Sequence, residues 1–219
     1  MRGVTPPERA QASPTSTRTD VTSVNAFRAR LLDALRASIT ERGYSETTIS
    51  DIVARARASR RTFYAVWPTK DDCLLSLMDE VDTALAKRLT NEVDPGAPWQ
   101  DQVAQAVQAY FEHVHEQPAV YLCAFRDLPA LGDAARASIR KANDTFVGVI
   151  HDLSDNEEFR RSGLGPTSRR LALIVLGGLN EMIADVLESG EDIRDSVPLG
   201  IATTTALLST SAGRSSVGA

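Results

Sequence analysis

The stretch of sequence that decides the fold runs from Leu31 to Leu77 and reads LLDALRASITERGYSETTISDIVARARASRRTFYAVWPTKDDCLLSL. Apolar side chains recur every four residues just before and within its first part, at Phe27, Leu31, Leu35 and Ile39. That spacing places them on one face of a helix, which we expect over residues 25–42. Glycine adopts positive φ without steric cost, so the following Gly43 is expected to end this helix.

Two short helices are expected next, each preceded by a residue that suits the cap of its first turn. Thr48 and Asp51 have the spacing of a capping box, in which each side chain accepts a backbone N–H, and they predict a helix over residues 48–55. After a three-residue turn, Ser59 is a good N-cap for a helix over residues 60–66. Helix, short turn and second helix is the layout of a helix-turn-helix, whose second helix enters the major groove of DNA.

The first turn of that second helix is rich in side chains that recognise nucleic acid. An arginine can donate two hydrogen bonds to one guanine, while hydroxyl groups and helix N-terminal amides bind phosphate. The side chains of these kinds are Ser59, Arg60, Arg61, Thr62 and Tyr64. A solvated basic helix face is the alternative interpretation of the same charges.

The charge distribution favours DNA binding by this segment alone. Over all 219 residues the net charge is −5 and the isoelectric point is about 5.3, which excludes a protein that coats nucleic acid by bulk charge. Residues 25–70, however, carry nine basic and four acidic residues, whereas residues 71–219 carry twelve basic and twenty-three acidic ones. A basic head on an acidic body is typical of site-specific binding through the head.

The stretch from Leu31 to Leu77 also resembles the N-terminal domain of tetracycline-repressor-type (TetR family) regulators. The motifs that carry the resemblance are Glu41-Arg42-Gly43-Tyr44, Thr47-Thr48-Ile49, Asp51-Ile52, Ser59, Thr62-Phe63-Tyr64 and Pro68-Thr69-Lys70. The resemblance implies an all-α protein, in which an N-terminal three-helix helix-turn-helix domain precedes a helical ligand-binding and dimerisation domain. It also implies a regulator of transcription that binds double-stranded DNA at a palindromic operator as a homodimer and responds to a small-molecule effector. We expect a repressor.

Carried over position by position, the resemblance implies DNA contacts from Thr48, Ser59, Arg60, Arg61, Thr62, Tyr64 and Lys70. Thr48 and Lys70 would lie at helix starts against phosphates. Capping alone remains the alternative role for Thr48, and packing alone remains the alternative for Tyr64.

Three positions depart from the family pattern. Arg57 stands in the turn where the family usually has glycine, and a non-glycine residue in a left-handed conformation is strained by about 1–2 kcal/mol. Val66 occupies a position that is commonly polar, often histidine. Trp67 replaces phenylalanine and remains aromatic. The first two departures predict that DNA contacts at Arg57 and Val66 differ from those of the family pattern.

The remainder of the chain predicts helices and little else. A capping box at Thr69 and Asp72 predicts a helix to Leu89, and further helices are expected over residues 98–115, 118–127, 132–154, 166–189 and 197–209. We therefore divide the chain into a disordered arm (1–24), a helix-turn-helix domain (25–70), an effector-binding and dimerisation domain (71–211) and a disordered tail (212–219).

The helix over 166–189 is apolar on all sides between Leu171 and Leu179. Such a helix must be covered on two sides, which predicts a four-helix dimer interface made with the helix over 197–209. Internal packing within a monomer is the alternative. Dimerisation would place two heads on half-sites about 34 Å apart, which is why the operator should be palindromic.

An effector pocket is expected among the helices between residues 98 and 189. Its candidate lining residues are Tyr110, His113, Tyr121, Phe125, Phe146 and Asn180. An apolar pocket with a few polar groups suits an apolar or aromatic effector. Each of these residues could instead serve only the core or the surface.

Other functional classes find little support. The nucleotide-binding, hydrolase and zinc-protease motifs are absent, so we expect no enzyme, no catalytic residues, no cofactor and no metal site. Two cysteines and the lack of a signal peptide or a long apolar run predict a cytoplasmic protein without a membrane segment. A helical protein–protein interaction module without DNA binding is the alternative function.

Overall fold

The protein is all-α, as expected, and its computed structural model describes residues 16–210. No strand occurs within that range. The helices are α1 (Ser16–Glu46), α2 (Ile49–Arg55), α3 (Arg60–Tyr64), α4 (Lys70–Glu92), α5 (Trp99–Glu116), α6 (Pro118–Leu122), α7 (Asp133–Ser154), α8 (Glu157–Arg161), α9 (Arg169–Ser189) and α10 (Val197–Ser209). Three tighter or wider turns join them, namely the π-helical η1 (Cys123–Asp127) and the 3₁₀-helical η2 (Leu128–Leu131) and η3 (Ile193–Ser196).

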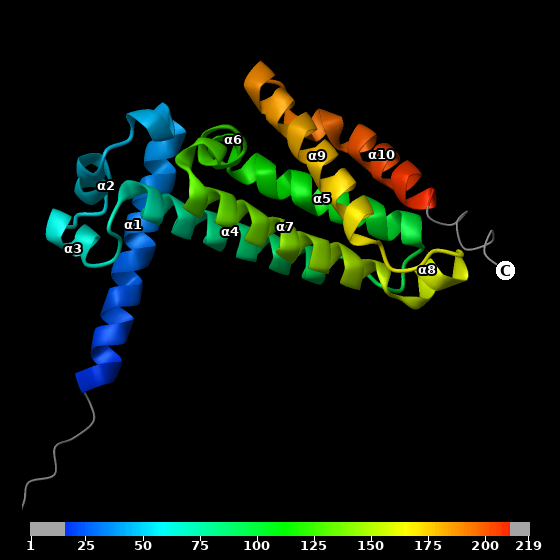
Figure 1. The fold of residues 1–219 in the computed structure, drawn as a ribbon, viewed down its shortest axis with the longest axis horizontal. Helices are drawn as coiled ribbons and strands as arrows, with labels where there is room; N and C mark the ends of the chain where they lie inside the picture. The colour runs from blue at the N-terminus through cyan, green and yellow to red at the C-terminus, as the bar shows by residue number, and fades with distance from the viewer. Residues whose placement is uncertain (1–15, 211–219) are drawn as a thin grey trace, which may run out of the picture.

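The head of the molecule consists of α1, α2, α3 and the start of α4. Helix α2 packs against both α1 and α3, and α1 also packs against α4 (Figure 1). The predicted capping boxes are both present, with Asp51 closing the one at Thr48 and Asp72 closing the one at Thr69. Leu31, Leu35, Ile52, Phe63 and Leu74 are fully buried at the centre of this head.

Helix α1 differs from its predicted bounds at both ends. It begins at Ser16 rather than near residue 25, so residues 16–24, which were assigned to a disordered arm, are helical. Residues 1–15 and the predicted tail over 212–219 lie outside the described range. Gly43 interrupts the helix as predicted; its φ of 79° is positive, while its ψ of 167° lies outside the left-handed helical range.

The body of the molecule is a bundle in which α4, α5 and α7 run side by side (Figure 1). Helix α4 leaves the head and packs against α5 and α7, so one helix joins the two parts of the molecule. Helix α10 packs against α5, α9 packs against α7, and α9 and α10 contact each other. Within the described range, no helix is long and apolar enough to cross a membrane.

Two predicted helices of the body differ in detail. The helix expected over 118–127 is present with these bounds, but it changes from the α-helical α6 to the π-helical η1 after Leu122. The helix expected from residue 166 begins at Arg169, where the Ser168 hydroxyl accepts the N–H of Leu171. The short helix α8 was not predicted.

Candidate DNA-binding surface and ligand cavity

The N-terminal turn of α3 presents its polar side chains to solvent while Phe63 anchors the helix from below. Ser59 caps the helix by accepting the N–H of Thr62 at 3.0 Å, and the two hydroxyls lie 2.9 Å apart. Phe63 is fully buried, which fixes the direction of the exposed side chains beside it. Tyr64 is 54% exposed and meets the Phe63 ring edge-on, so its hydroxyl points away from the core.

The turn between α2 and α3 keeps a left-handed residue although that residue is an arginine. Arg57 has φ 49°, and no other non-glycine residue in the described range has positive φ. Its N–H binds the carbonyl of Ala54 at 3.2 Å, and the next N–H, of Ala58, binds the carbonyl of Val53 at 2.9 Å. These two bonds form the helix end that glycine usually provides. The exposed side chain of Arg57 thus adds a cation to the turn at some cost in strain.

The arginines of the head fall into two groups. Three on α1 and α2 are neutralised, because Arg36 pairs with Asp33 and Glu80, Arg42 pairs with Glu41 and Asp51, and Arg55 pairs with Glu41. Arg28 and Arg30 of α1 have no carboxylate within 4 Å among the described residues and lie over the rings of Trp67 and Phe27. Those of the turn and α3 are not neutralised either: among the described residues, no carboxylate lies within 4 Å of Arg57, Arg60 or Arg61. Arg60 donates to the Ser50 hydroxyl, and Arg61 has no hydrogen bond in that range. Within the described head, the arginines without a carboxylate partner therefore lie on α3, on the turn before it, and at Arg28 and Arg30 of α1.

Thr48 and Lys70 are both engaged within the head. The Thr48 hydroxyl accepts the N–H of Asp51 at 3.2 Å and donates to its carboxylate at 2.6 Å. The pKa of Asp51 is lowered chiefly by these bonds to Thr48. The Lys70 ammonium donates to the carbonyls of Tyr44 and Thr47 at 2.9 and 2.8 Å, and lies 4.1 Å from the Tyr44 ring centre. Lys70 thus braces the end of α1 against the start of α4, and one N–H remains for a phosphate.

The joint between α1 and α4 has a second bond beside Lys70. The Tyr44 hydroxyl donates to the carboxylate of Asp71, and burial together with that carboxylate raises the tyrosine pKa well above its usual value. Val66 is half-buried and packs against the core, so it offers no polar group at this position. Trp67 is buried and donates its indole N–H to the Ser76 hydroxyl at 2.7 Å.

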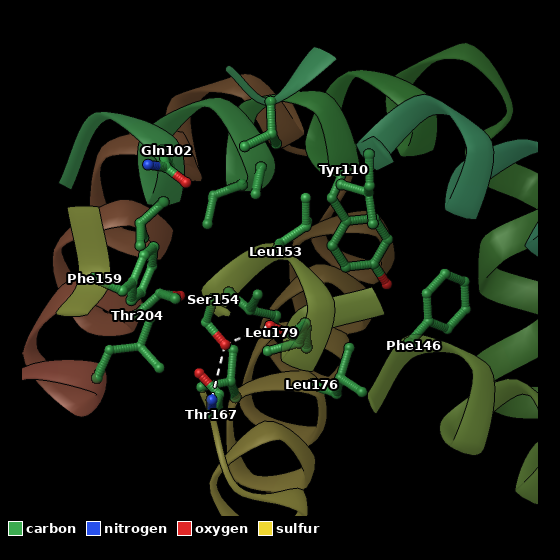
Figure 2. A pocket seen from close by; sticks show the side chains of 18 residues that line it. Gln102, Tyr110, Phe146, Leu153, Ser154, Phe159, Thr167, Leu176, Leu179 and Thr204 are labelled. Atoms are coloured by element: carbon green, nitrogen blue, oxygen red, sulfur yellow. Dashed lines mark hydrogen bonds between the residues drawn. The ribbon is translucent and has the colours of Figure 1, made fainter. Parts of the chain in front are cut away.

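The body encloses two neighbouring cavities. The first has a volume of about 100 Å³ and lies among α4, α5, α7, α9 and α10 (Figure 2). Its wall is mostly aliphatic, with a few polar side chains such as Ser154, whose hydroxyl accepts the N–H of Thr167 at 2.7 Å. The Thr204 hydroxyl is buried in this wall and has no hydrogen-bond partner.

The second cavity, of about 120 Å³, lies nearer the head. It is formed by α4, α5, α6, η1, η2, α7 and α9, and it shares Leu89, Tyr110, Phe146 and Leu176 with the first. The Tyr110 hydroxyl donates to the Asn180 side-chain carbonyl at 2.7 Å. In contrast, the buried hydroxyl of Tyr121 has no hydrogen-bond partner among residues 16–210.

Asp82 of α4 is the charged group of this second cavity. Burial, and to a smaller extent the neighbouring carboxylate of Asp79, raise the pKa of Asp82 to about 6, while Lys141 acts in the opposite direction. Asp82 was not among the residues predicted from the sequence to line a pocket. The signal was present, because Asp82 lies among Met78, Val81 and Leu85 at the spacing of the apolar stripe, where a carboxylate is unexpected.

Five of the six residues expected at an effector pocket line the second cavity: Tyr110, Tyr121, Phe125, Phe146 and Asn180. His113 lines neither cavity. It is 7% exposed, its ring lies 3.1 Å from the Gln117 side-chain amide, and burial lowers its pKa. His113 is therefore a packing residue that supports Tyr121, whose ring centre is 6.0 Å away.

Helix α9 is buried on one side, and its other side is apolar around Ile174 but acidic further along, at Glu181, Asp185 and Glu188. Ala172, Val175, Leu179 and Ile183 are buried against the body, whereas Ile174 is 58% exposed. On α10, which packs beside α9, Leu199 is 60% exposed. Gly177 and Gly178, with small residues of α10 such as Ala202, Thr203 and Ala206, are also exposed.

Comparison with known proteins adds a family and a fold to this geometry. Residues 31–77 match the family model described as bacterial regulatory proteins of the tetR family. The expected resemblance is thus confirmed, and this segment is a helix-turn-helix domain of that family. A search of curated protein sequences returns no match.

Solved structures with the same fold are numerous. A transcriptional regulator FadR from Bacillus subtilis, in complex with stearoyl-CoA, superposes with a TM-score of 0.69 at 19% identity, over 83% of this chain and 97% of its own. A tetR-family transcriptional regulator from Streptomyces coelicolor has a TM-score of 0.70 at 18% identity, over 86% and 82%. A tetR-family transcriptional regulator from Pectobacterium atrosepticum has a TM-score of 0.65 at 24% identity, over 87% of this chain and 96% of its own. At these identities the likeness extends the family's fold to the body.

Proposed function

We propose that this protein is a ligand-responsive regulator of transcription, which binds a palindromic operator as a homodimer and is released from it by a small molecule. The observation that carries the proposal is the exposed first turn of α3. There Arg60 and Arg61 lack acidic partners within the described range, on a domain that matches the tetR family.

The proposed DNA contacts follow from how each side chain is held. Arg60 and Arg61 are long, charged and exposed, so they can reach guanine edges or the flanking phosphates. The exposed hydroxyl of Tyr64 and the linked hydroxyls of Ser59 and Thr62 suit phosphate contacts. Thr48 and Lys70 would add weaker contacts, because each already serves the fold.

The apolar part of the outer face of α9, around Ile174, and the adjoining face of α10 are the proposed dimer interface. It carries exposed Ile174 and Leu199 beside residues small enough to let helices approach closely. Ile174→Asp should leave a folded monomer in size-exclusion chromatography with light scattering, while the wild type elutes as a dimer at micromolar concentration. A wild-type monomer would refute the dimer.

The second cavity is placed to connect a ligand with the head. Helix α6 and turn η1 line this cavity and also pack against α1, and α4 runs from the cavity into the head. A ligand can bind more tightly to the dimer when its two heads are spaced incorrectly for the operator. Such a ligand lowers DNA affinity by the difference between its binding free energies for the two head spacings. A dimer on promoter DNA blocks polymerase directly, which favours repression. The stearoyl-CoA complex of the FadR structure supports ligand binding within this fold.

The test begins with selection of genomic DNA fragments bound by the wild-type protein, which identifies the operator. The double variant Arg60→Ala/Arg61→Ala should then bind the operator at least tenfold more weakly. The slope of log affinity against log salt concentration should become less steep by about one for each phosphate contact removed. Arg160→Ala/Arg161→Ala on α8 is the matched control, since it also removes two adjacent arginines but from the far end of the body (Figure 1).

The outcome also separates the proposal from its alternative. A helical protein–protein interaction module would show no salt-dependent binding to duplex DNA in any variant. Equal losses in the α3 and α8 variants would indicate that bulk charge, rather than the reading surface, binds DNA.

A further inference from the structure

The two cavities of the body have a distinctive charge. Among the described residues that line them, none is a lysine, arginine or histidine, and the one carboxylate is that of Asp82. A ligand with an anionic end would therefore find no counter-charge in either wall. A cationic end would find one, at a single place in the second cavity.

The carboxylate of Asp82 is available to a ligand. It has no hydrogen bond and no ion pair within 4 Å in the described range, because the nearby Lys141 is paired with Asp79 one turn away. Asp82, Tyr110 and Tyr121 all line this cavity, and the charge of Asp82 contributes to the raised pKa of both phenols.

Aromatic rings surround the same space. The ring centre of Tyr121 lies 6.1 Å from that of Tyr110 and 5.8 Å from that of Phe125, and Phe146 completes the wall. Ring faces attract cations when these approach within about 6 Å. Tyr121 is 5% exposed, and its hydroxyl has no hydrogen-bond partner among the described residues. The hydroxyl oxygen is therefore free to accept a hydrogen bond.

We propose that the second cavity binds an organic amine, with its ammonium group between the Asp82 carboxylate and the Tyr121 hydroxyl and its apolar part among the aromatic rings. That this amine is the effector rests on the proposed function. An ammonium group supplies a positive charge to pair with the Asp82 carboxylate. It also supplies an N–H donor to the Tyr121 hydroxyl. The hydrocarbon part would extend past Leu89 and Leu176 toward the aliphatic first cavity.

The size of the cavity selects the probes. An apolar cavity of roughly 150 Å³ holds one benzene ring, so about 120 Å³ with an adjoining space suits a phenyl ring on a short chain. We choose 2-phenylethylamine, 2-phenylethanol and phenylacetate, which share the phenyl group and differ in carrying a cationic, a neutral and an anionic end.

Calorimetric titration of the full-length protein at pH 7.5, without DNA, tests the site. The amine should bind at least tenfold more tightly than the alcohol, and phenylacetate should bind more weakly than either. Asp82→Asn should remove the preference for the amine while changing alcohol affinity by less than about threefold. Tyr121→Phe should weaken amine binding several-fold with the cavity shape kept.

Asp152→Asn on α7 is the matched control, because this exposed aspartate lines neither cavity and should leave all three affinities unchanged. Equal binding of amine and alcohol, or a preference that survives in Asp82→Asn, would overturn the proposal. Operator binding is measured separately: amine binding without operator release refutes only the effector role, whereas operator binding without amine binding refutes only this site.

Discussion

Replacing Asp82 by asparagine should stabilise the protein at neutral pH. The pKa of Asp82 is raised from 3.8 to about 6, chiefly because burial disfavours its charged form. A raised pKa of about two units corresponds to about 3 kcal/mol, since each unit is worth about 1.4 kcal/mol. The side chain keeps some contact with solvent, so about 3 kcal/mol is an upper bound. Asparagine has the same shape and no charge, and it avoids this penalty.

The sign of the pH dependence follows from proton counting. Below pH 3.8 the carboxyl is protonated in both the folded and the unfolded chain, so the penalty is absent. Between pH 3.8 and 6 the unfolded chain binds fewer protons than the folded one, and the free energy of unfolding falls as pH rises. Above pH 6 the full penalty is present. Asp79 and Lys141 also face this carboxyl, while the neighbouring phenols of Tyr110 and Tyr121 stay neutral throughout.

Urea unfolding of wild type and Asp82→Asn at fixed protein concentration, between pH 3.5 and 7.5, measures the difference. The gain in the variant should grow from near zero at the lowest pH to about 2–3 kcal/mol above pH 6.5. Asp152→Asn should show no such trend. A variant that is less stable than wild type at pH 7.5 would refute the reasoning, because it would mean that the carboxylate makes a favourable interaction in the folded protein.

Three further substitutions test the fold around the sites. Arg57→Gly should raise the free energy of unfolding by about 1 kcal/mol, because glycine adopts φ 49° without strain, and a loss would mean that the arginine stabilises the turn. Gly200→Val should lower it by about 1–3 kcal/mol, since even a Cβ there would lie 3.1 Å from the Phe111 ring; an unchanged melting temperature would contradict this. Trp67→Phe should cost about 1 kcal/mol through the lost bond to Ser76, and Ser76→Ala in that background should then be nearly neutral.

The head was predictable from sequence because local rules determine it. Both capping boxes and the Ser59 cap are signals within four residues, and α2 and α3 begin where these signals place them. The start of α1 was not predictable in the same way, since the polar residues after Ser16 lack an apolar stripe. The left-handed turn at Arg57 was suspected only through the family resemblance, because arginine itself does not favour positive φ.

The cavity was predictable only in part because its walls come from seven separate elements, the turn η2 with Leu128 among them. Aromatic and amide side chains on apolar helix faces marked five of its residues, but the same criterion wrongly included His113, which the fold turns toward Gln117. Asp82 was missed although its place in the apolar stripe of α4 marked it, because the pocket prediction relied on aromatic, histidine and amide side chains. The change from α6 to η1 depends on contacts of η1 with α1 and α9 that lie far apart in the sequence.

The penalty at Asp82 also limits how strongly an amine could release DNA. An ammonium group that neutralises the buried carboxylate can remove at most the burial penalty of about 3 kcal/mol. Operator binding is weakened only by the part of this gain that the amine makes in the DNA-free protein and not in the DNA-bound one. Because each 1.4 kcal/mol is tenfold, an amine should weaken operator affinity at pH 7.5 by up to about 100-fold for each of the two cavities of the dimer that it occupies. At pH 5 the carboxyl is mostly protonated, so the same amine should bind more weakly and release less DNA, and Asp82→Asn should release little at either pH. Operator titrations with and without amine at both pH values measure this, and equal release at pH 5 and 7.5 would place the coupling elsewhere than at Asp82.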